Sequence, residues 1–239
     1  MTVLYEDNHI IAVNKTCNEI VQGDKTGDTP LSELVKVYIK EKYDKPGEVF
    51  LGVTHRLDRP TSGVVLFART SKALARLNDM FKSHTEIKKT YWAIVANAPE
   101  APEGRLENYL IRNEQQNKSY IARVDKDGNP LNKDAKKAVL SYKTIAQGER
   151  YTLLEINLET GRHHQIRCQL AAIGCPIKGD LKYGAKRSNP DGGICLHARR
   201  IEFIHPVSKQ PISIVAPVPE DKLWQDLARQ AELSTDYRQ

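Results

Sequence analysis

The most constraining feature of the chain is the nine-residue stretch 55–63, which reads His-Arg-Leu-Asp-Arg-Pro-Thr-Ser-Gly. It connects an apolar stretch at residues 50–53 to the apolar run Val64–Phe67, which predicts a tight connection between two strands. Pro60 fixes its backbone φ angle, and Gly63 permits either a close approach or an unusual φ. The sequence therefore predicts a strand, a turn that concentrates polar side chains, and a second strand.

Asp58 is the one carboxylate in this stretch, and Arg56 and Arg59 flank it. Two neighbouring guanidinium groups favour the ionised form of a carboxylate. An ionised carboxylate on a rigid turn suits a nucleophile or a general base. The alternative is an Arg-Asp pair that only braces a loop, and for an isolated R-x-D pattern this alternative is favoured.

Composition restricts the classes of protein and of partner. The 239 residues suffice for one large mixed domain or two small ones. A net charge of +6, from 36 basic and 30 acidic residues, suits a polyanionic partner without requiring one. The cysteines are too scattered for a C-x-x-C metal motif or a disulfide scaffold, which indicates reduced thiols in a cytoplasmic protein. We expect no membrane segment, because no apolar run approaches the length of a span.

Apolar periodicity predicts a mixture of short strands and a few helices. The predicted strands are Val3–Tyr5, Ile10–Val13, Trp92–Ala96, Ala138–Ile145, Tyr151–Leu158, Ile194–His197, Ile201–Ile204 and Ile212–Val215, with two exposed strands within 105–135. The first predicted helix has Thr29 as its N-cap and Pro30 as its first residue. A second starts at Thr70 or Ser71 and places Leu74, Leu77, Asn78 and Phe81 on one face; a third contains Ile166, Leu170 and Ile173; a fourth surrounds Trp224.

The stretch 55–63 resembles, almost residue for residue, the catalytic motif of the RluA-like pseudouridine synthases, which isomerise uridine in RNA. Further stretches are similar to motifs of the same family, from about residue 3 to residue 216. They are Lys89-Thr90-Tyr91, Thr160–Arg167, the loop Pro176–Gly184, and Leu196-His197-Ala198. The resemblance implies an α+β fold: a single catalytic domain, residues 1–239, with a central, mostly antiparallel mixed β-sheet, flanking helices and a basic active-site cleft. We expect no accessory N-terminal RNA-binding domain.

The resemblance also implies roles for individual residues. Asp58 would start the reaction, by attacking C1′ of the ribose, by attacking C6 of the base or by abstracting a ribose proton. Tyr91 would contact the target base, and Arg167 would pair with Asp58. The expected substrate-binding residues are His55, Arg56, Leu57, Thr61, Ser62, Arg162, Ile166 and Leu196. The basic residues expected to hold phosphates are Lys72, Arg76, Lys88, Lys89 and Arg162.

We expect no cofactor and no metal. His163 and His164 are adjacent at the predicted start of a helix, so their side chains should point apart, and no carboxylate or cysteine ligand lies at a suitable spacing. The expected partner is a structured RNA, either tRNA or rRNA, acted on by a monomer. The target uridine should be flipped out of its helix, because a stacked uracil cannot rotate. Arg56 is the candidate to fill the vacated space or to hold the flipped nucleotide.

Two rival functions come from other classes. A non-catalytic RNA-binding module with the same fold would be favoured by the loss of Asp58 or Arg167, and both are present. A carboxylate N-glycosidase usually needs a second carboxylic acid, and the stretch 55–63 contains one carboxylate. The chain also departs from the family pattern at Thr16-Cys17-Asn18, where a proline and a glycine are usual, and at Asn97, Gln169 and Cys175. These departures concern loop conformation and substrate choice.

Overall fold

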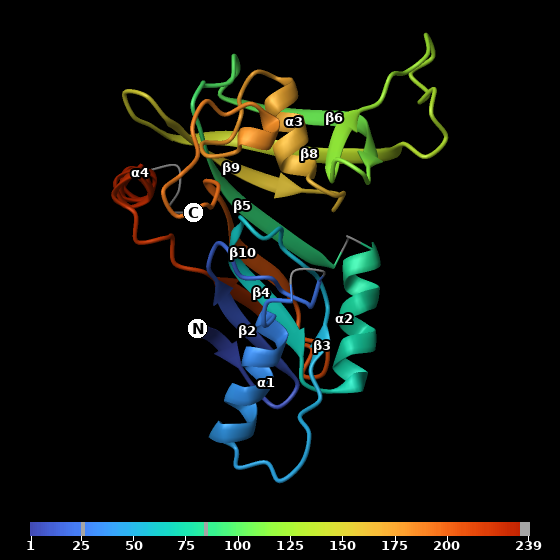
Figure 1. The fold of residues 1–239 in the computed structure, drawn as a ribbon, viewed down its shortest axis with the longest axis vertical. Coiled ribbons are helices and arrows are strands. Elements are labelled where there is room, and N and C mark those ends of the chain that lie inside the picture. The colour runs from blue at the N-terminus through green and yellow to red at the C-terminus, as the bar shows by residue number, and fades with distance from the viewer. Residues whose placement is uncertain (25–26, 84–85, 235–239) are drawn as a thin grey trace. The chain divides into compact units, whose positions relative to one another are not determined.

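The computed structural model describes residues 1–24, 27–83 and 86–234 (Figure 1). Two compact units make up the chain: unit 1 combines Met1–Lys89 with His197–Pro217, and unit 2 combines Thr90–Leu196 with the residues from Val218 onward. Among the described residues, each unit contains β-strands and two α-helices, and most strand pairs are antiparallel. The predicted α+β class with a mostly antiparallel mixed sheet is confirmed, while a single catalytic domain with a basic cleft stays a prediction.

The sheet of unit 1 is organised around β4, Ser62–Ala68, which directly follows the stretch that carries Asp58. β4 pairs antiparallel with β2, and it pairs parallel with β10 through Ser62–His197 and Gly63–Ala198. β2 and β4 are buried almost throughout, as expected for strands covered on both faces. The other strands of this unit are β1 (Thr2–Glu6), β2 (Ile10–Lys15), β3 (Gly52–Val53), most of β10 (Leu196–Ile204) and β11 (Pro211–Val215).

Helix α1, Leu31–Lys42, begins one residue later than predicted, with Pro30 as its N-cap and no capping side chain. The carbonyl groups of Ile20 and Val21 explain the difference. They accept hydrogen bonds from the N–H groups of Leu31 and Ser32 at 2.8 and 3.2 Å. Backbone carbonyls thereby satisfy two of the amide groups at the helix start that a capping side chain would otherwise serve.

Helix α2, Ser71–Ser83, begins as predicted, because Thr70 Oγ1 accepts a hydrogen bond from the Ala73 N–H at 3.2 Å. Its buried face consists of Ala73, Leu77 and Met80. The predicted apolar face was wrong in one member, because Asn78 is exposed. An amide at that position loses nothing by facing water, whereas burial would require hydrogen-bond partners.

The sheet of unit 2 is an antiparallel series in the order β5-β9-β8-β6-β7. Its strands are β5 (Ile87–Val95, of which Thr90–Val95 belong here), β6 (Glu103–Asn113), β7 (Lys118–Ile121), β8 (Lys136–Gln147) and β9 (Thr152–Leu158). Helix α3, Gln165–Ala172, lies against β6 and β7, and helix α4, Lys222–Leu233, packs on β8 and β9 (Figure 1). Side chains such as Trp92, Leu140 and Leu170 form the core between these elements.

Two predictions near the C-terminal part need correction. Ile173 lies beyond the end of α3 and is 39% exposed, so it does not belong to the buried face of that helix. The two predicted strands at Ile194–His197 and Ile201–Ile204 are one strand, β10. Arg199 and Arg200 interrupt the apolar pattern, yet their side chains are half-buried and the pairing with β11 continues through Arg200. Backbone hydrogen bonding carries the strand past these polar side chains.

Candidate active site

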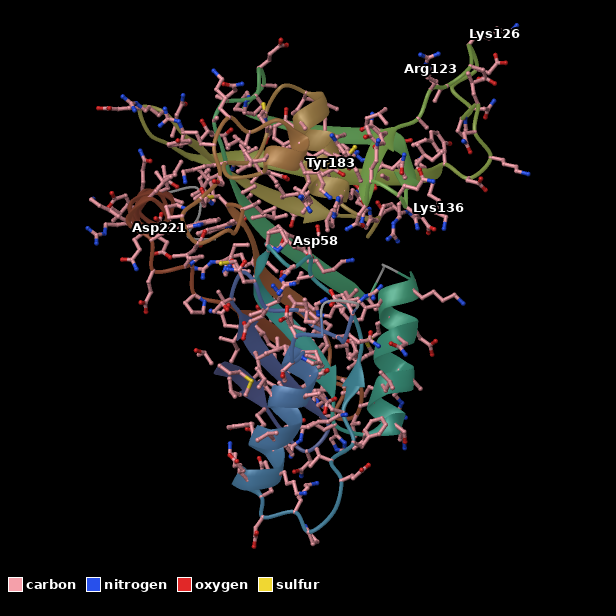
Figure 2. All side chains as sticks on the ribbon, viewed as in Figure 1. Asp58, Arg123, Lys126, Lys136, Tyr183 and Asp221 are labelled. Atoms are coloured by element: carbon pink, nitrogen blue, oxygen red, sulfur yellow. The ribbon has the colours of Figure 1, made fainter. Side chains whose placement is uncertain are left out.

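The loop between β3 and β4 carries Asp58, labelled in Figure 2. The Thr61 N–H donates to the Asp58 carbonyl oxygen at 3.0 Å, which closes a turn around Arg59 and Pro60. The Asp58 side chain is half-buried, and Arg56 is exposed. The predicted strand, turn and strand are confirmed, with the candidate carboxylate at the first position of the turn.

Arg59 braces this turn from the outside. Its Nε donates to the Asn18 carbonyl oxygen at 3.1 Å, and its guanidinium forms an ion pair with Asp28. The Asn18 N–H in turn donates to the Arg59 carbonyl oxygen at 3.0 Å. Asn18 has a φ of 72°, a region in which glycine is usual and asparagine is tolerated. The segment Thr16-Cys17-Asn18 therefore adopts a backbone bend without the glycine that the family pattern leads one to expect.

Lys15 holds the same turn from the inside. The side chain is fully buried, and its Nζ donates to the carbonyl oxygens of Thr16 at 2.9 Å, Arg59 at 2.9 Å and Thr61 at 2.6 Å, with Asp58 O at 3.4 Å. Burial lowers the pKa of Lys15 to about 8, because a desolvated ammonium is disfavoured. An ammonium has three donors, and the three shorter contacts match that number. Lys15 therefore fixes the backbone that presents Asp58.

Gly63 and Ser62 attach the other end of the loop to β10. Gly63 has a φ of +117°, and a Cβ atom there would collide with the backbone of Ala198. Ser62 Oγ lies 2.8 Å from His197 Nδ1, and His197 Nε2 lies 3.3 Å from the Ala216 carbonyl oxygen. Burial lowers the pKa of His197 to about 4, so the ring is neutral. The prediction that Gly63 provides a close approach and an unusual φ is confirmed on both counts.

His55 anchors the start of the loop. Its Nε2 accepts a hydrogen bond from the Leu66 N–H at 3.0 Å, and its ring stacks on Phe81 with centroids 4.7 Å apart. Burial, assisted by the charge of Lys89, lowers the pKa of His55 to about 3. The ring is thus neutral and one of its nitrogens is bound to β4. Leu57, Thr61 and Ser62 are also buried, so most of the stretch supports Asp58 from within unit 1.

Three apolar candidates belong to unit 2. Tyr91 lies on β5 opposite Ile156 of β9, is half-buried, and packs against the core cluster that includes Ile166 and Leu196. Ile166 and Leu196 are 5% and 4% exposed. Ile166 and Leu196 thus belong to the core of unit 2, and Tyr91 packs against that core.

Gln165 organises the start of α3. Its Oε1 accepts from Thr160 Oγ1 at 2.8 Å and from the Arg162 N–H at 3.0 Å, while its Nε2 donates to the Val139 carbonyl oxygen at 3.0 Å. Arg162 is half-buried and its Nε donates to the Lys137 carbonyl oxygen at 2.9 Å. The buried amide thereby fixes the turn that precedes Arg167.

Arg167 is buried, at 5% exposure, and it binds Asp180 in two places. Its Nε lies 2.7 Å from Asp180 Oδ2, and its Nη2 lies 2.9 Å from Oδ1. Sequence reasoning placed Asp180 in a matching loop but gave it no role. The signal that could have indicated this partner is the Gly179-Asp180 pair, which lies in the loop after the helix that carries Arg167. Pairing of Arg167 with Asp58 stays a prediction.

The basic residues expected to hold phosphates differ in how available they are. Lys72 is exposed, and Lys88 lies 3.7 Å from Glu202. Arg76 donates to the Pro206 carbonyl oxygen at 2.5 Å and is half-buried. Lys89 is 9% exposed and lies over the Phe81 ring at 6.0 Å. The Lys89 ammonium therefore faces an aromatic ring and is largely withdrawn from solvent, and a phosphate contact by Lys89 stays a prediction.

The arrangement suits acid–base or nucleophilic chemistry by a carboxylate. Asp58 belongs to unit 1, whereas Tyr91, Arg167 and Leu196 belong to unit 2. The expectation that the side chains of His163 and His164 point apart is wrong, because their rings stack with centroids 3.8 Å apart. Within residues 1–24, 27–83 and 86–234, no group of three histidine, cysteine or acidic side chains could hold a metal ion. In the same ranges no helix has both the length and the apolar character needed to cross a membrane.

Comparisons with known proteins agree with this arrangement. Residues 9–172 match the RNA pseudouridylate synthase family. Ribosomal large subunit pseudouridine synthase D of Xanthomonas campestris is 33% identical, over 98% of this chain and 72% of that protein. tRNA pseudouridine synthase C of Vibrio cholerae is 31% identical, over 95% of this chain and 94% of that protein.

Among solved structures, human RNA pseudouridylate synthase domain containing 4 shares the fold with a TM-score of 0.77. The two chains are 22% identical, and the match covers 98% of this chain and 94% of that one. The fold and the sequence together define an RNA-modifying isomerase. The chain belongs to the RluA-like family of RNA pseudouridine synthases.

Proposed function

We propose that Asp58 starts the conversion of uridine to pseudouridine on a flipped-out nucleotide of a structured RNA. The observation that carries this proposal is the turn 58–61, which Lys15 fixes through main-chain carbonyl groups while the Asp58 side chain stays half-buried. A carboxylate on a backbone held in this way is pre-organised for reaction. The match of residues 55–63 to the catalytic motif of the family supports the same assignment.

The reaction exchanges one bond for another. The N1–C1′ glycosidic bond breaks, the uracil turns, and a C5–C1′ bond forms, while C5 loses a proton and N1 gains one. The product has the same atoms as the substrate, so no oxidant, reductant or co-reactant is consumed. Asp58 can serve by attacking C1′, by attacking C6 or by abstracting a ribose proton, and each route requires its ionised form.

The target base must leave its stack before the uracil can turn. Arg56 is exposed, which supports a role in filling the vacated space or holding the flipped nucleotide. Tyr91 would stack on the uracil, with Leu196 on the opposite wall, and the half-buried position of Tyr91 on β5 supports its part in this assignment. Arg167 would pair with Asp58 and keep it charged, and Arg162 would contact the RNA backbone.

The substrate would be ribosomal RNA or tRNA. Two similar relatives are named for the large ribosomal subunit and for tRNA. We expect the enzyme to act as a monomer, without a cofactor or metal.

Transcripts of large-subunit rRNA and of tRNAs, labelled with tritium at uracil C5, provide the test. Bond formation at C5 should release tritium to water without releasing free uracil, and RNA mass should change only by the loss of label. An N-glycosidase would instead release labelled uracil and leave abasic sites. If the RNA binds but neither tritium nor free uracil is released, the result would favour a non-catalytic RNA-binding module.

A further inference from the structure

The loop Pro176–Gly184 follows α3 and contains a buried partner for Arg167. Asp180 is 1% exposed, so its carboxylate is almost completely withdrawn from water. Both of its oxygen atoms accept from the Arg167 guanidinium, at 2.7 and 2.9 Å. A bidentate pair of this kind fixes the plane of the guanidinium as well as its position. Asp180 takes the Nε–Nη2 edge of the guanidinium, so a further acceptor in its plane would meet Nη1.

Tyr183 is a second neighbour of the Arg167 guanidinium. The Arg167 Cζ atom lies 5.1 Å from the centroid of the Tyr183 ring, within the range of a cation–π contact. The Tyr183 hydroxyl accepts from the Ser119 N–H at 2.8 Å and lies 3.0 Å from His164 Nδ1. Figure 2 shows Tyr183 beside α3. The ring is therefore held in place by β7 and by the residue that precedes α3.

Asp180 is itself placed by main-chain bonds. Its N–H donates to the Ile177 carbonyl oxygen at 3.0 Å, and its own carbonyl oxygen accepts from Tyr183 at 3.1 Å and Ala185 at 3.0 Å. Gly179 has a φ of +90°, which favours glycine. The loop thus holds both partners of Arg167 in one compact turn, in which Leu181–Tyr183 form a 3₁₀ helix.

We propose that Asp180 and Tyr183 are positioning residues for catalysis: they fix the orientation of the Arg167 guanidinium, on which its proposed pairing with Asp58 depends. The proposal rests on the proposed role of Arg167. A simple structural pair would need only charge compensation, whereas here two side chains from a single turn contact the same guanidinium, Asp180 along one edge and Tyr183 with its ring. Such constraint is what orientation-dependent catalysis requires.

The first test replaces Asp180 by asparagine and measures kcat and KM on the RNA that the wild-type enzyme modifies. Asparagine keeps the shape but offers a single acceptor oxygen, so the guanidinium gains freedom. We expect kcat to fall by about tenfold or more, with KM changed by less than about twofold, because orientation is lost and RNA contacts are kept. Asp191→Asn is the matched control, since Asp191 is exposed in the following segment and should give wild-type values.

The second test observes the arginine directly by the ¹⁵N NMR signal of its Nε–H group, assigned with Arg167→Lys. The wild-type protein should show a slowly exchanging Nε–H, and Asp180→Asn should shift this signal and speed its exchange. Tyr183→Phe keeps the ring but loses the hydroxyl contacts that hold it, so it should lower kcat less than Tyr183→Leu, which should lower kcat by about tenfold, the scale of an orientation defect.

Three results would overturn the proposal. They are a folded Asp180→Asn enzyme with wild-type kcat, equal effects of the phenylalanine and leucine variants at position 183, and a wild-type Arg167 Nε–H that exchanges rapidly. If Asp180→Asn does not fold, the NMR signal of the wild-type protein and the pair of Tyr183 variants decide. A wild-type enzyme that releases no tritium from any RNA would contradict the proposed function instead, and the NMR measurement would still report whether the guanidinium is held.

Discussion

The Nζ atom of Lys15 lies 2.6 Å from the carbonyl oxygen of Thr61, so a residue at the end of β2 reaches the last residue before β4. Both side chains are buried, at 0% and 2% exposure. The ammonium donates hydrogen bonds to several carbonyl oxygens of this turn. Asp58 is presented from a backbone that a single buried charge holds together.

Lys15→Met should therefore destabilise the protein and lower its activity. The change removes the charged donor of the buried Thr61 carbonyl and of the part-buried Thr16 and Arg59 carbonyls, of which Arg59 keeps the Asn18 N–H. A buried carbonyl left unsatisfied costs about 1–3 kcal/mol. Chemical denaturation at pH 7 measures the loss. Lys40→Met is the control, because Lys40 is an exposed lysine of α1, and it should unfold as the wild type does.

The stability of the wild-type protein should depend on pH through the same lysine. Its pKa falls from 10.5 to about 8 on folding, so between these values the unfolded chain binds more protons than the folded one. The contribution of Lys15 to the free energy of unfolding therefore rises with pH across this window, by up to about 1.4 kcal/mol per pH unit. Denaturation of wild type and Lys15→Met from pH 7 to 10 measures this, and parallel curves would contradict it.

Asp58→Asn should abolish pseudouridine formation while folding and RNA affinity stay close to wild type. Asparagine preserves the shape of the side chain but is neither a nucleophile nor a base. Tritium release, the melting temperature and RNA binding are measured on the same preparation. Near wild-type turnover by this variant would remove Asp58 from the reaction.

Arg167→Met should lower turnover severely and also destabilise the fold. It leaves the buried carboxylate of Asp180 without its partner, and breaking a buried pair typically costs about 3–5 kcal/mol. The double variant Arg167→Met/Asp180→Asn removes both charges, so it should recover much of the stability without recovering activity. Recovery of both stability and activity by the double variant would show that Arg167 is needed only for folding.

Gly63→Ala should disrupt the junction of β4 and β10. Alanine adds strain at a φ of +117° and a collision with the Ala198 backbone. Gly174→Ala is the matched control, since Gly174 has a φ of +77° but open space around its Cβ position. The control should lose only about 1–2 kcal/mol from the left-handed backbone, and Gly63→Ala clearly more. Equal losses in urea unfolding would show that the close approach has no energetic role.

RNA affinity should fall steeply with salt. A footprint of about five phosphates predicts a log–log slope of about −3.5 to −4.5. Arg76 is occupied by the Pro206 carbonyl group, so Lys72→Glu is the cleaner test of this face of α2. It should weaken binding. Because one phosphate contact is lost, the magnitude of the log–log slope should fall by about 0.7–0.9. Lys40→Glu, with the same change of charge on α1, should not. Equal salt slopes for Lys72→Glu and Lys40→Glu would show that the RNA does not contact this face of α2.

Much of the fold could be predicted because its elements follow simple periodicities. The apolar runs of β2 and β4 and the Thr70 cap of α2 appear where local patterns predict them. The start of α1 could not be predicted, since the carbonyl groups of Ile20 and Val21 replace a capping side chain and no local pattern encodes that contact. β10 could not be predicted as one strand, because Arg199 and Arg200 interrupt its apolar pattern while its backbone pairing with β11 continues.

The site shows the same division. The stretch 55–63 and its Gly63 requirement were predictable, because glycine and proline report directly on backbone geometry. The long-range partners of the charged side chains could not be predicted. Lys15 ends an apolar strand and Asp180 lies in a glycine-bearing loop, and nothing in their local sequence indicates what each side chain reaches. Long-range polar contacts depend on tertiary structure that composition and periodicity do not encode.

The parallel pairing of β4 with β10 also determines the order in which the protein can be completed. Ser62 and His197 are 135 positions apart, so during synthesis the loop that carries Asp58 leaves the ribosome long before its partner strand exists. Closing so large a loop is slow and comes late in folding. A nascent chain that ends before residue 197 contains Asp58 but lacks the strand that pairs with Ser62 and Gly63 at the end of its loop. The pairing of this loop with β10 therefore cannot form until residue 197 has left the ribosome.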